Sequence, residues 1–500
     1  MAKRVRTVAL VAGVVAAAGF GCSATDEDAR PRWLHHSIVL DNQPFLDRAP
    51  ELVEGKFAVM ADSLYAYMRG TVTQFSEDLV LPGGAARVPS AYLTPDSRSV
   101  TIMSDPHPEN LGTFLTADGL LVLEYNDFDG ATFGPYVFDV RRMAVGHWIF
   151  VEQVDRDLRR IGSNVEISEV HRRMAVEAAA RGYAEEIVRI AAGEEGIVVD
   201  DRRSWGAIVD ELFTRTRQRG RQGDRLRAYT VDEASGRRLR IGDIDPQRTI
   251  EIGRRETTVF DDTLVAISPE EVAMLEGLLE QYADTLLDRA GLRVDDRRTL
   301  DFARRMGAGV SSYPNLRYYV LLEGIGEDED DVLLEVKETI DAVELPGLER
   351  FPDNVTRTNA ERVVLMQRRF QAAADSDPWL GWASSGGQSH RMRERSSYQR
   401  NHAVDRVVRE LDRGNFVVDD VFAFAELAGR ILARSHAMAP RQNGRLAGPA
   451  IAAAIGGDVK GFVEETVAFA DSYLPQVLAD HESFVTLVER HGFHLGYRRF

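Results

Sequence analysis

The stretch VTIMSDPHPENLGTFLTADGLLVLEYNDFDG, residues 100–130, decides how the chain is interpreted. Short apolar runs at 100–103, 113–115 and 120–125 predict three strands. The pair Asp118-Gly119 predicts a hairpin turn between the second strand and the third. We therefore expect a strand, a proline-containing loop, and a hairpin whose last strand ends in a run of polar residues.

Several polar side chains of this stretch are of the types that phosphoryl transfer requires. Asp105 can orient an attacking hydroxyl and accept its proton. Asn110 and Asp127 offer an amide oxygen and a carboxylate to Mg²⁺, which neutralises phosphate oxygens. Asp129 is either a second carboxylate for the metal or a cap of the following turn. Turn chemistry explains each residue singly, but their combination favours a site for a divalent metal and a phosphate group.

The composition of the chain excludes some classes of protein. The 500 residues are 44% hydrophobic and 28% charged, which is typical of a folded protein and not of a disordered or fibrous one. At about 150 residues per domain, this length predicts roughly three domains or two large lobes. The net charge of −18 disfavours DNA or RNA as a partner, because phosphate contacts need clustered Lys and Arg.

The N-terminal segment has the layout of an export signal. A basic start at residues 3–6 precedes an apolar run from Val8 to Phe20, and Gly21-Cys22 follows. Cys22 is the only cysteine, so no intrachain disulfide can form. Its position resembles the lipid-modified cysteine of bacterial lipoproteins, although an uncleaved anchor or ordinary export are alternatives. We expect a signal peptide over 1–21, a lipid on Cys22, and an exported protein held at the bacterial cell envelope on its periplasmic or outer-membrane face.

The central stretch resembles the catalytic loop and metal aspartate of protein-kinase-like enzymes. The pattern D-x-x-x-x-N followed by a later Asp-Phe is most similar to the aminoglycoside and choline kinase branch, whose loop begins His-Gly-Asp. The residues here are Met103-Ser104-Asp105, so Met and Ser replace the His and Gly. The resemblance implies that Asp105 is the base, that Asn110 and Asp127 hold Mg²⁺, and that His107 shapes the loop.

Kinases also carry a glycine-rich loop and a strand lysine, which bind the phosphates of ATP. The candidates lie about two hundred residues after Asp105. The run 307–318 contains the loop-like residues, which are Gly307, Gly309, Ser311, Ser312 and Arg317. The strand expected at 332–337 ends on Lys337, whose alternative role is a solvent-facing edge lysine. A helix expected from Asn359 brings Glu361 as the partner of the lysine, although a helix-dipole role in the first turn is equally consistent.

The order of these segments predicts a rearranged fold. The run Leu432-Ala-Arg-Ser-His436-Ala resembles the helix that normally precedes the catalytic loop, and it predicts that His436 packs against this loop. The resemblance implies an α+β, protein-kinase-like, two-lobed fold that is circularly permuted. We expect a tether at 22–55, a helical lobe with the catalytic loop at 56–300, a small β-rich lobe at 301–400, and C-terminal helices at 401–500 that complete the large lobe. Within the segment 56–300 we expect one helix over 57–68 and another over about 269–290, where Ser268 and Glu271 form a capping box and Pro269 occupies the first turn.

The whole pattern is similar to the bacterial family called domain of unknown function 2252. The residues that carry this similarity are spread along the chain at 67–70, 105–112, 126–129, 134–135, 139–142, 309–318, 337–338 and 377–382. The chain departs from the family where Ser311 and Pro314 replace glycines and where residues 386–398 are unusually polar.

The sequence leaves several functions open. The first is a kinase-like phosphotransferase that uses Mg-ATP on an unknown small-molecule or protein acceptor. The second is a degenerate lipoprotein that binds a nucleotide or a protein partner without turnover. The third is a metal-dependent hydrolase that uses Asp105, His107, Asp127 and Asp129. The arginine-rich run 215–227 is either a solvated loop or a patch for an anionic substrate.

Overall fold

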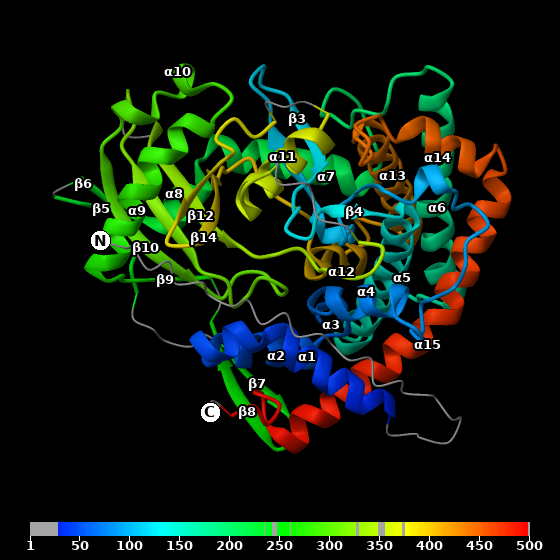
Figure 1. The fold of residues 1–500 in the computed structure, drawn as a ribbon. Coiled ribbons are helices and arrows are strands. Elements are labelled where there is room, and N and C mark those ends of the chain that lie inside the picture. Colours follow the sequence, from blue (N-terminus) through cyan, green and yellow to red (C-terminus); the bar gives the residue numbers. More distant parts are fainter. Residues whose placement is uncertain are drawn as a thin grey trace, which may run out of the picture.

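The fold is described from a computed structural model. Its described residues are 29–234, 236–242, 248–260, 262–326, 330–348, 356–372 and 376–498. The predicted signal peptide over 1–21 and Cys22 lie outside these residues. Figure 1 shows helices gathered on one side of the molecule and a large antiparallel sheet on the other.

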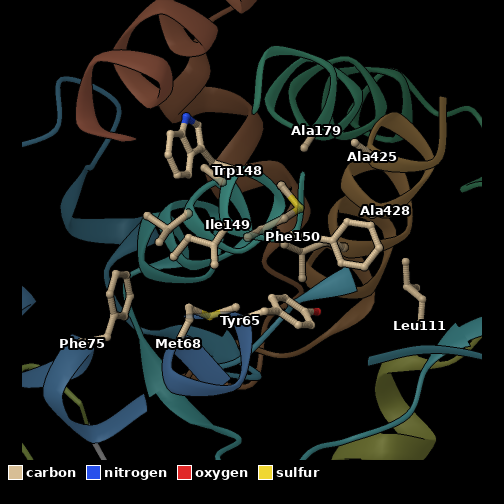
Figure 2. Packing of buried hydrophobic residues seen from close by; sticks show 14 of the residues in the cluster. Tyr65, Met68, Phe75, Leu111, Trp148, Ile149, Phe150, Ala179, Ala425 and Ala428 are labelled. Carbon is tan, nitrogen blue, oxygen red and sulfur yellow. The ribbon is translucent and has the colours of Figure 1, made fainter. Parts of the chain in front are cut away.

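The helical body is built around one long apolar helix, α5 (Tyr136–Arg160). Its consecutive residues Trp148, Ile149 and Phe150 are all buried, because helices and strands surround α5 on every side that these residues face. Figure 2 shows α5 between α3, α6 and α13, with small residues such as Ala179 and Ala425 at the close contacts. The other helices of this body are α6 (Glu169–Ala191), α7 (Ala207–Arg221), α12 (Val404–Asp412), α13 (Val418–Met438), α14 (Gly448–Ile455) and α15 (Val459–His491). The short helix α8 (Asp224–Tyr229) follows α7 and lies on the side of the large sheet in Figure 1.

The N-terminal region is helical, so the prediction of a tether at 22–55 is wrong for the described residues 29–55. It forms α1 (Ala29–Arg48), α2 (Pro50–Asp62), α3 (Leu64–Gly70) and α4 (Val72–Val80). Polar residues of α1 misled the prediction, because its buried face is narrow and includes Leu34 and Ile38. Ser63 caps α3 by accepting a hydrogen bond from the Ala66 N–H, and thereby splits the single helix expected over 57–68.

The expected strands around the central loop are present. They are β1 (Val100–Ile102), β2 (Leu111–Leu115), β3 (Leu121–Tyr125) and β4 (Thr132–Gly134). The β2–β3 hairpin turns at Asp118-Gly119, where Gly119 has a φ of 83° that suits glycine. β1 pairs with β4, so the polar residues 126–129 return toward the start of the loop at 103–105.

The large sheet is antiparallel, with the strand order β13-β14-β12-β11-β10-β9 among the described residues. Its strands are β9 (Thr263–Val265), β10 (Thr299–Met306), β11 (Arg317–Leu322), β12 (Val332–Thr339), β13 (Gly381–Ser385) and β14 (Gln388–Glu394). The helices beside it are α9 (Pro269–Tyr282), α10 (Arg289–Leu292) and α11 (Asn359–Phe370). Because β9 and α9 belong to this unit, the sheet extends into the segment 56–300 that was expected to be helical.

Helix α9 begins as the sequence predicts and ends earlier. Ser268 and Glu271 form the expected capping box, and Pro269 occupies the first turn. The helix ends at Tyr282 and not near residue 290, because a 3-10 turn follows. Its apolar side packs on one face of the large sheet, against Val320 and Val336 among others.

Two small hairpins project from these units. One is β5 (Thr230–Glu233) with β6 (Gly236–Leu239), and the other is β7 (Arg248–Ile252) with β8 (Arg255–Val259). The second hairpin lies beneath α2 in Figure 1 and packs on it.

The two faces of the large sheet differ in chemistry. One face is apolar and is covered by α9. Strand register places Arg317, Lys337 and Arg391 in one row across the opposite face, and Tyr319, Glu335 and Arg393 in the next. This second, charged face is turned toward the helical body, and the functional site lies between the two.

Candidate functional site

A buried network holds the start of the central loop. Asp139 on α5 accepts hydrogen bonds from the Met103 and Ser104 N–H groups at 2.7 and 2.8 Å. His436 on α13 contacts the same carboxylate at 3.0 Å. Ser104 has a φ of 72°, which is rare for a residue other than glycine. The prediction that His436 packs against the loop is thus met through Asp139, and the positive φ of Ser104 is a conformation that glycine adopts more readily.

Asp105 is oriented by a buried arginine. Arg142 Nε donates to Asp105 Oδ1 at 2.8 Å, and the His107 ring lies 3.6 Å from Oδ2. Burial raises the pKa of Asp105, although the neighbouring Arg142 and Arg69 oppose this shift. Burial also lowers the pKa of His107 well below its usual value, so this ring is neutral, and its Nδ1 atom hydrogen-bonds the Tyr65 hydroxyl on α3 at 3.1 Å. Asp105 therefore has a fixed direction and a raised proton affinity.

Asn110 and Asp127 face a common cavity. The Asn110 side-chain NH₂ donates to the Asp105 carbonyl at 2.8 Å, and the Asn126 N–H donates to the Asn110 carbonyl at 2.9 Å. The Asp127 side chain is 37% exposed, and both residues line the cavity. The surrounding protein desolvates Asp127, which raises its pKa, but Lys337 and Arg391 outweigh this effect and bring the value to about 2. Asp127 is therefore an ionised carboxylate at neutral pH.

Lys337 reaches this cavity from the large sheet. Its side chain is 2% exposed, and Nζ lies 2.5 Å from Asp129 Oδ2 and 3.7 Å from Asp127 Oδ2. The alternative prediction, that Lys337 is an edge lysine facing solvent, is therefore wrong. The second oxygen of Asp129, Oδ1, is buried and has no hydrogen-bond partner among the described residues. The fold thus brings Lys337 to Asp127 and Asp129 beside Asn110, whereas Asp105 is joined to Asn110 through its backbone carbonyl and does not line the cavity.

The predicted glycine loop connects β10 to β11 at the rim of the cavity. Gly307 and Gly309 have φ values of 74° and 83°, which favour glycine. Gly309 and Ser312 line the cavity, whereas Ser311 is exposed and lies outside its lining. Arg317 donates to the Ser312 hydroxyl at 3.1 Å and approaches Glu335 at 3.5 Å.

Glu361 does not join this group. Its carboxylate accepts a hydrogen bond from the Arg357 N–H at 2.6 Å, and its own N–H donates to Thr358 at 3.1 Å. Glu361 therefore stabilises the N-terminus of α11. This agrees with the alternative prediction for Glu361, a role in the first turn of the helix and not as the partner of Lys337. The carboxylate that pairs with Lys337 is Asp129.

The cavity itself is small and strongly cationic. Its volume is about 260 Å³. The cations that line it among the described residues are Arg69, Arg225, Arg305, Arg317, Lys337, Arg391, Arg393, Arg395 and Arg400. We call it the arginine cavity. In a chain with a net charge of −18, such a concentration of positive charge indicates an anionic ligand.

One buried carboxylate anchors much of this charge. Glu335 is 2% exposed and lies 2.9 Å from Arg305, 3.5 Å from Arg317 and 3.0 Å from Arg391. Arg393 approaches it at 3.7 Å. Burial would raise the pKa of Glu335, but these guanidinium groups hold it well below its usual value.

Sequence reasoning missed the arginines of β14 and the segment after it. Their signal was present, because Arg391, Arg393 and Arg395 alternate and alternate residues of a strand share one face. The run 215–227 is not a loop, since α7 covers 207–221 and α8 covers 224–229. From this run, Arg225 lines the cavity, whereas Arg217 donates to Asp201 at 2.5 Å outside it.

The oxygen atoms at this site fit a Mg²⁺ ion that binds together with a phosphate ligand better than a metal site made of protein side chains alone. No group of three or more His, Cys, Asp and Glu side chains able to hold a metal occurs in the described part of the chain. Mg²⁺ commonly binds through one or two carboxylates and the oxygens of a phosphate ligand. Asp127, the Asn110 side-chain oxygen and the unpartnered Asp129 Oδ1 match such a site.

Comparisons with known proteins reach the family level. No curated protein and no solved structure matches the chain. Among the described residues, no helix is both long and apolar enough to span a membrane. One family model, described as an uncharacterized protein conserved in bacteria, matches residues 48–487, which include the central loop, Lys337 and the arginine cavity. The chain therefore belongs to the DUF2252 family.

Proposed function

We propose that this protein is a kinase-like phosphotransferase that transfers a phosphoryl group from Mg-ATP to an acceptor. The observation that carries the proposal is the meeting of Lys337 with Asp127 and Asp129 beside Asn110. Lys337 comes from the large sheet and is 208 residues away from Asp129 in the sequence, whereas Asn110, Asp127 and Asp129 belong to the central stretch 100–130. Phosphoryl transfer depends on such a combination of a phosphate-binding cation and metal-binding oxygens.

The order of the elements in the large sheet supports a kinase-like arrangement. A glycine-containing loop joins β10 to β11, β12 carries Lys337, and α11 follows β12. This is the order of glycine loop, strand lysine and helix in protein kinases. Here these elements follow the catalytic loop in sequence, and the spatial meeting at the cavity is what a circular permutation of such a fold would produce.

Each residue has a role that its surroundings favour. Asp105, fixed by Arg142, would orient the acceptor hydroxyl and take its proton, and its raised pKa favours proton acceptance. Lys337 and the neighbouring arginines would hold phosphate oxygens. The backbone N–H groups of Ala308, Gly309 and Ser312, three residues that line the cavity, would add donors for a phosphate. Asn110 and Asp127 would hold Mg²⁺, which supplies charge neutralisation.

The test is a titration of the full-length protein with Mg-ATP, followed by a measurement of phosphate transfer or slow ATP hydrolysis. Asp127→Asn removes a metal ligand, so we expect affinity for Mg-ATP to fall about tenfold or more and turnover about a hundredfold. Asp118→Asn, in the turn of the same β2–β3 hairpin, is the matched control and should change neither. Absence of Mg-ATP binding by folded wild type would overturn the proposal. Binding without any turnover would favour the degenerate alternative, a binding protein.

We also propose that Cys22 carries a lipid and holds the exported protein at the cell envelope. The support is the order of basic start, apolar run and lone cysteine. Metabolic labelling with a fatty acid should mark the wild type and not Cys22→Ser, and the variant should leave the membrane fraction. Equal labelling of both would contradict the proposal.

A further inference from the structure

The arginine cavity holds more positive charge than its protein neighbours balance. Its nine lining cations have six carboxylates within 4 Å among the described residues, which are Glu109, Asp127, Asp129, Asp224, Asp262 and Glu335. Arg225 and Arg395 have no carboxylate this close in that part of the chain. Buried like charges repel one another and are costly unless a counter-charge is present. An anionic ligand would supply this counter-charge.

Donor atoms of these arginines are buried and unused. Arg391 Nε, on a side chain that is 3% exposed, has no hydrogen-bond partner among the described residues. The same holds for Nε and Nη1 of Arg393 and for Nε of Arg225 and Arg395. Buried donors are normally satisfied, so each of these points to a missing acceptor. Several donors that converge on one cavity indicate a ligand with many acceptor oxygens.

The cavity lacks the features that a purine base requires. The apolar side chains among its described lining residues are Phe114 and Ala308, and Phe114 is 1% exposed. Pockets for flat organic ligands are mostly apolar and span about 300–1,000 Å³. This cavity is about 260 Å³ and is lined almost throughout by charged and polar groups. It suits a compact, highly charged group better than a nucleoside.

We propose that the arginine cavity binds a chain of phosphate groups and leaves any nucleobase outside. The ligand class is then an inorganic polyphosphate or the triphosphate of any nucleotide, recognised by the same guanidinium groups. Guanidinium forks bind phosphate oxygens in pairs, and the cavity is lined by Arg391 and Arg393 from β14 and by Arg225 from α8. The inference rests on the proposed function, because the same site would hold the phosphoryl donor.

The first experiment compares ligands on the full-length protein by calorimetry, with and without Mg²⁺. ATP, GTP, CTP and inorganic tripolyphosphate are expected to bind within about tenfold of one another, and orthophosphate more weakly. Adenosine is expected not to compete. The affinity of each phosphate ligand should fall with salt, because charge dominates the contact. Strong preference for ATP, or competition by adenosine, would overturn the inference.

The second experiment uses two variants of cavity-lining arginines from different elements. Arg393→Gln on β14 and Arg225→Gln on α8 should each weaken ATP and tripolyphosphate alike, by about tenfold or more. Both variants should melt no lower than wild type without ligand, because each removes a poorly balanced buried charge. Arg298→Gln, whose side chain is 70% exposed and paired with Glu323, is the control. Unchanged affinity in both folded variants would also overturn the inference.

These outcomes separate the inference from the proposed function. Equal binding of tripolyphosphate and nucleotides without phosphate transfer to any acceptor would sustain the inference and remove the phosphotransferase. ATP-specific binding with transfer would do the reverse. No binding of any phosphate ligand to the folded protein would overturn both.

Discussion

The ion pair between Lys337 and Asp129 joins the sheet to the central loop, and each partner depends on the other. Lys337→Met would leave a mostly buried carboxylate without its cation, and we expect a loss of roughly 2–4 kcal/mol in the free energy of unfolding. Asp129→Asn should cost a similar amount. The double variant should recover most of this loss, because it removes both charges. Urea unfolding of the four proteins measures this coupling, and simply additive losses would contradict it.

At the residue scale, the sequence predicted the residues that share one short stretch. Asp105, Asn110 and Asp127 could be expected to lie near one another, because the loop and the β2–β3 hairpin that connect them are local structures. The partner of Lys337 could not be identified in this way. Asp129 and Glu361 were both available carboxylates, and only the packing of β12 against residues 126–129 decides for Asp129.

At the element scale, a substitution in the first turn of α11 can test whether Glu361 caps the helix or supports Lys337 in catalysis. Glu361→Gln keeps the shape of the side chain and weakens its bond to the Arg357 N–H, so we expect a loss of about 0.5–1 kcal/mol in stability. Phosphotransfer, measured beside it, should stay within about twofold of wild type. If Glu361→Gln instead lost as much phosphotransfer activity as the Lys337→Met variant does, Glu361 would support the lysine.

The end of β14 gives the protein a dependence of stability on pH. Burial, with the nearby Asp377, raises the pKa of Glu394 from 4.5 to about 7. The folded state therefore binds this proton more tightly than the unfolded state does. The contribution of Glu394 to the free energy of unfolding is therefore greatest below about pH 4.5. It falls as the pH rises to about 7 and is constant above that pH.

Glu394→Gln should remove this pH dependence, because the amide does not titrate. Relative to wild type we expect a gain of roughly 1–3 kcal/mol at pH 8 and little change at pH 5. Thermal melts of both proteins across this range provide the measurement. Parallel curves at all pH values would contradict the assignment.

The elements themselves were predicted with uneven success, and the reasons are physical. The capping box of α9 and the β2–β3 turn are local signals, and they were read correctly. The helix α1 was missed because its narrow apolar stripe is stabilised by packing on α15 and not by its own sequence. The arginines of β14 were noticed as polarity, yet their common direction depends on register with β12.

At the scale of the whole molecule, buried ion pairs connect the two ends of the chain. Arg30 on α1 lies 2.7 Å from Asp78 on α4 and 2.5 Å from Asp480 on α15. Arg30→Gln would leave both buried carboxylates without a cation, so we expect a loss of about 2–4 kcal/mol. Urea unfolding and limited proteolysis near α1 should report the change. Arg173→Gln, whose side chain is 55% exposed, is the control, and equal effects in both variants would contradict this assignment.

The beginning of α1 at Ala29 also limits how far the molecule can move from a membrane. If Cys22 carries a lipid, only residues 23–28 separate it from the first residue of α1. A fully extended chain would then place the Cα atom of Ala29 at most about 25 Å from that of Cys22. Arg48 at the other end of α1 is bonded to Glu338, next to Lys337, at 2.7 Å. The height of the arginine cavity above the bilayer would then be limited to the size of the folded protein plus the length of this short segment.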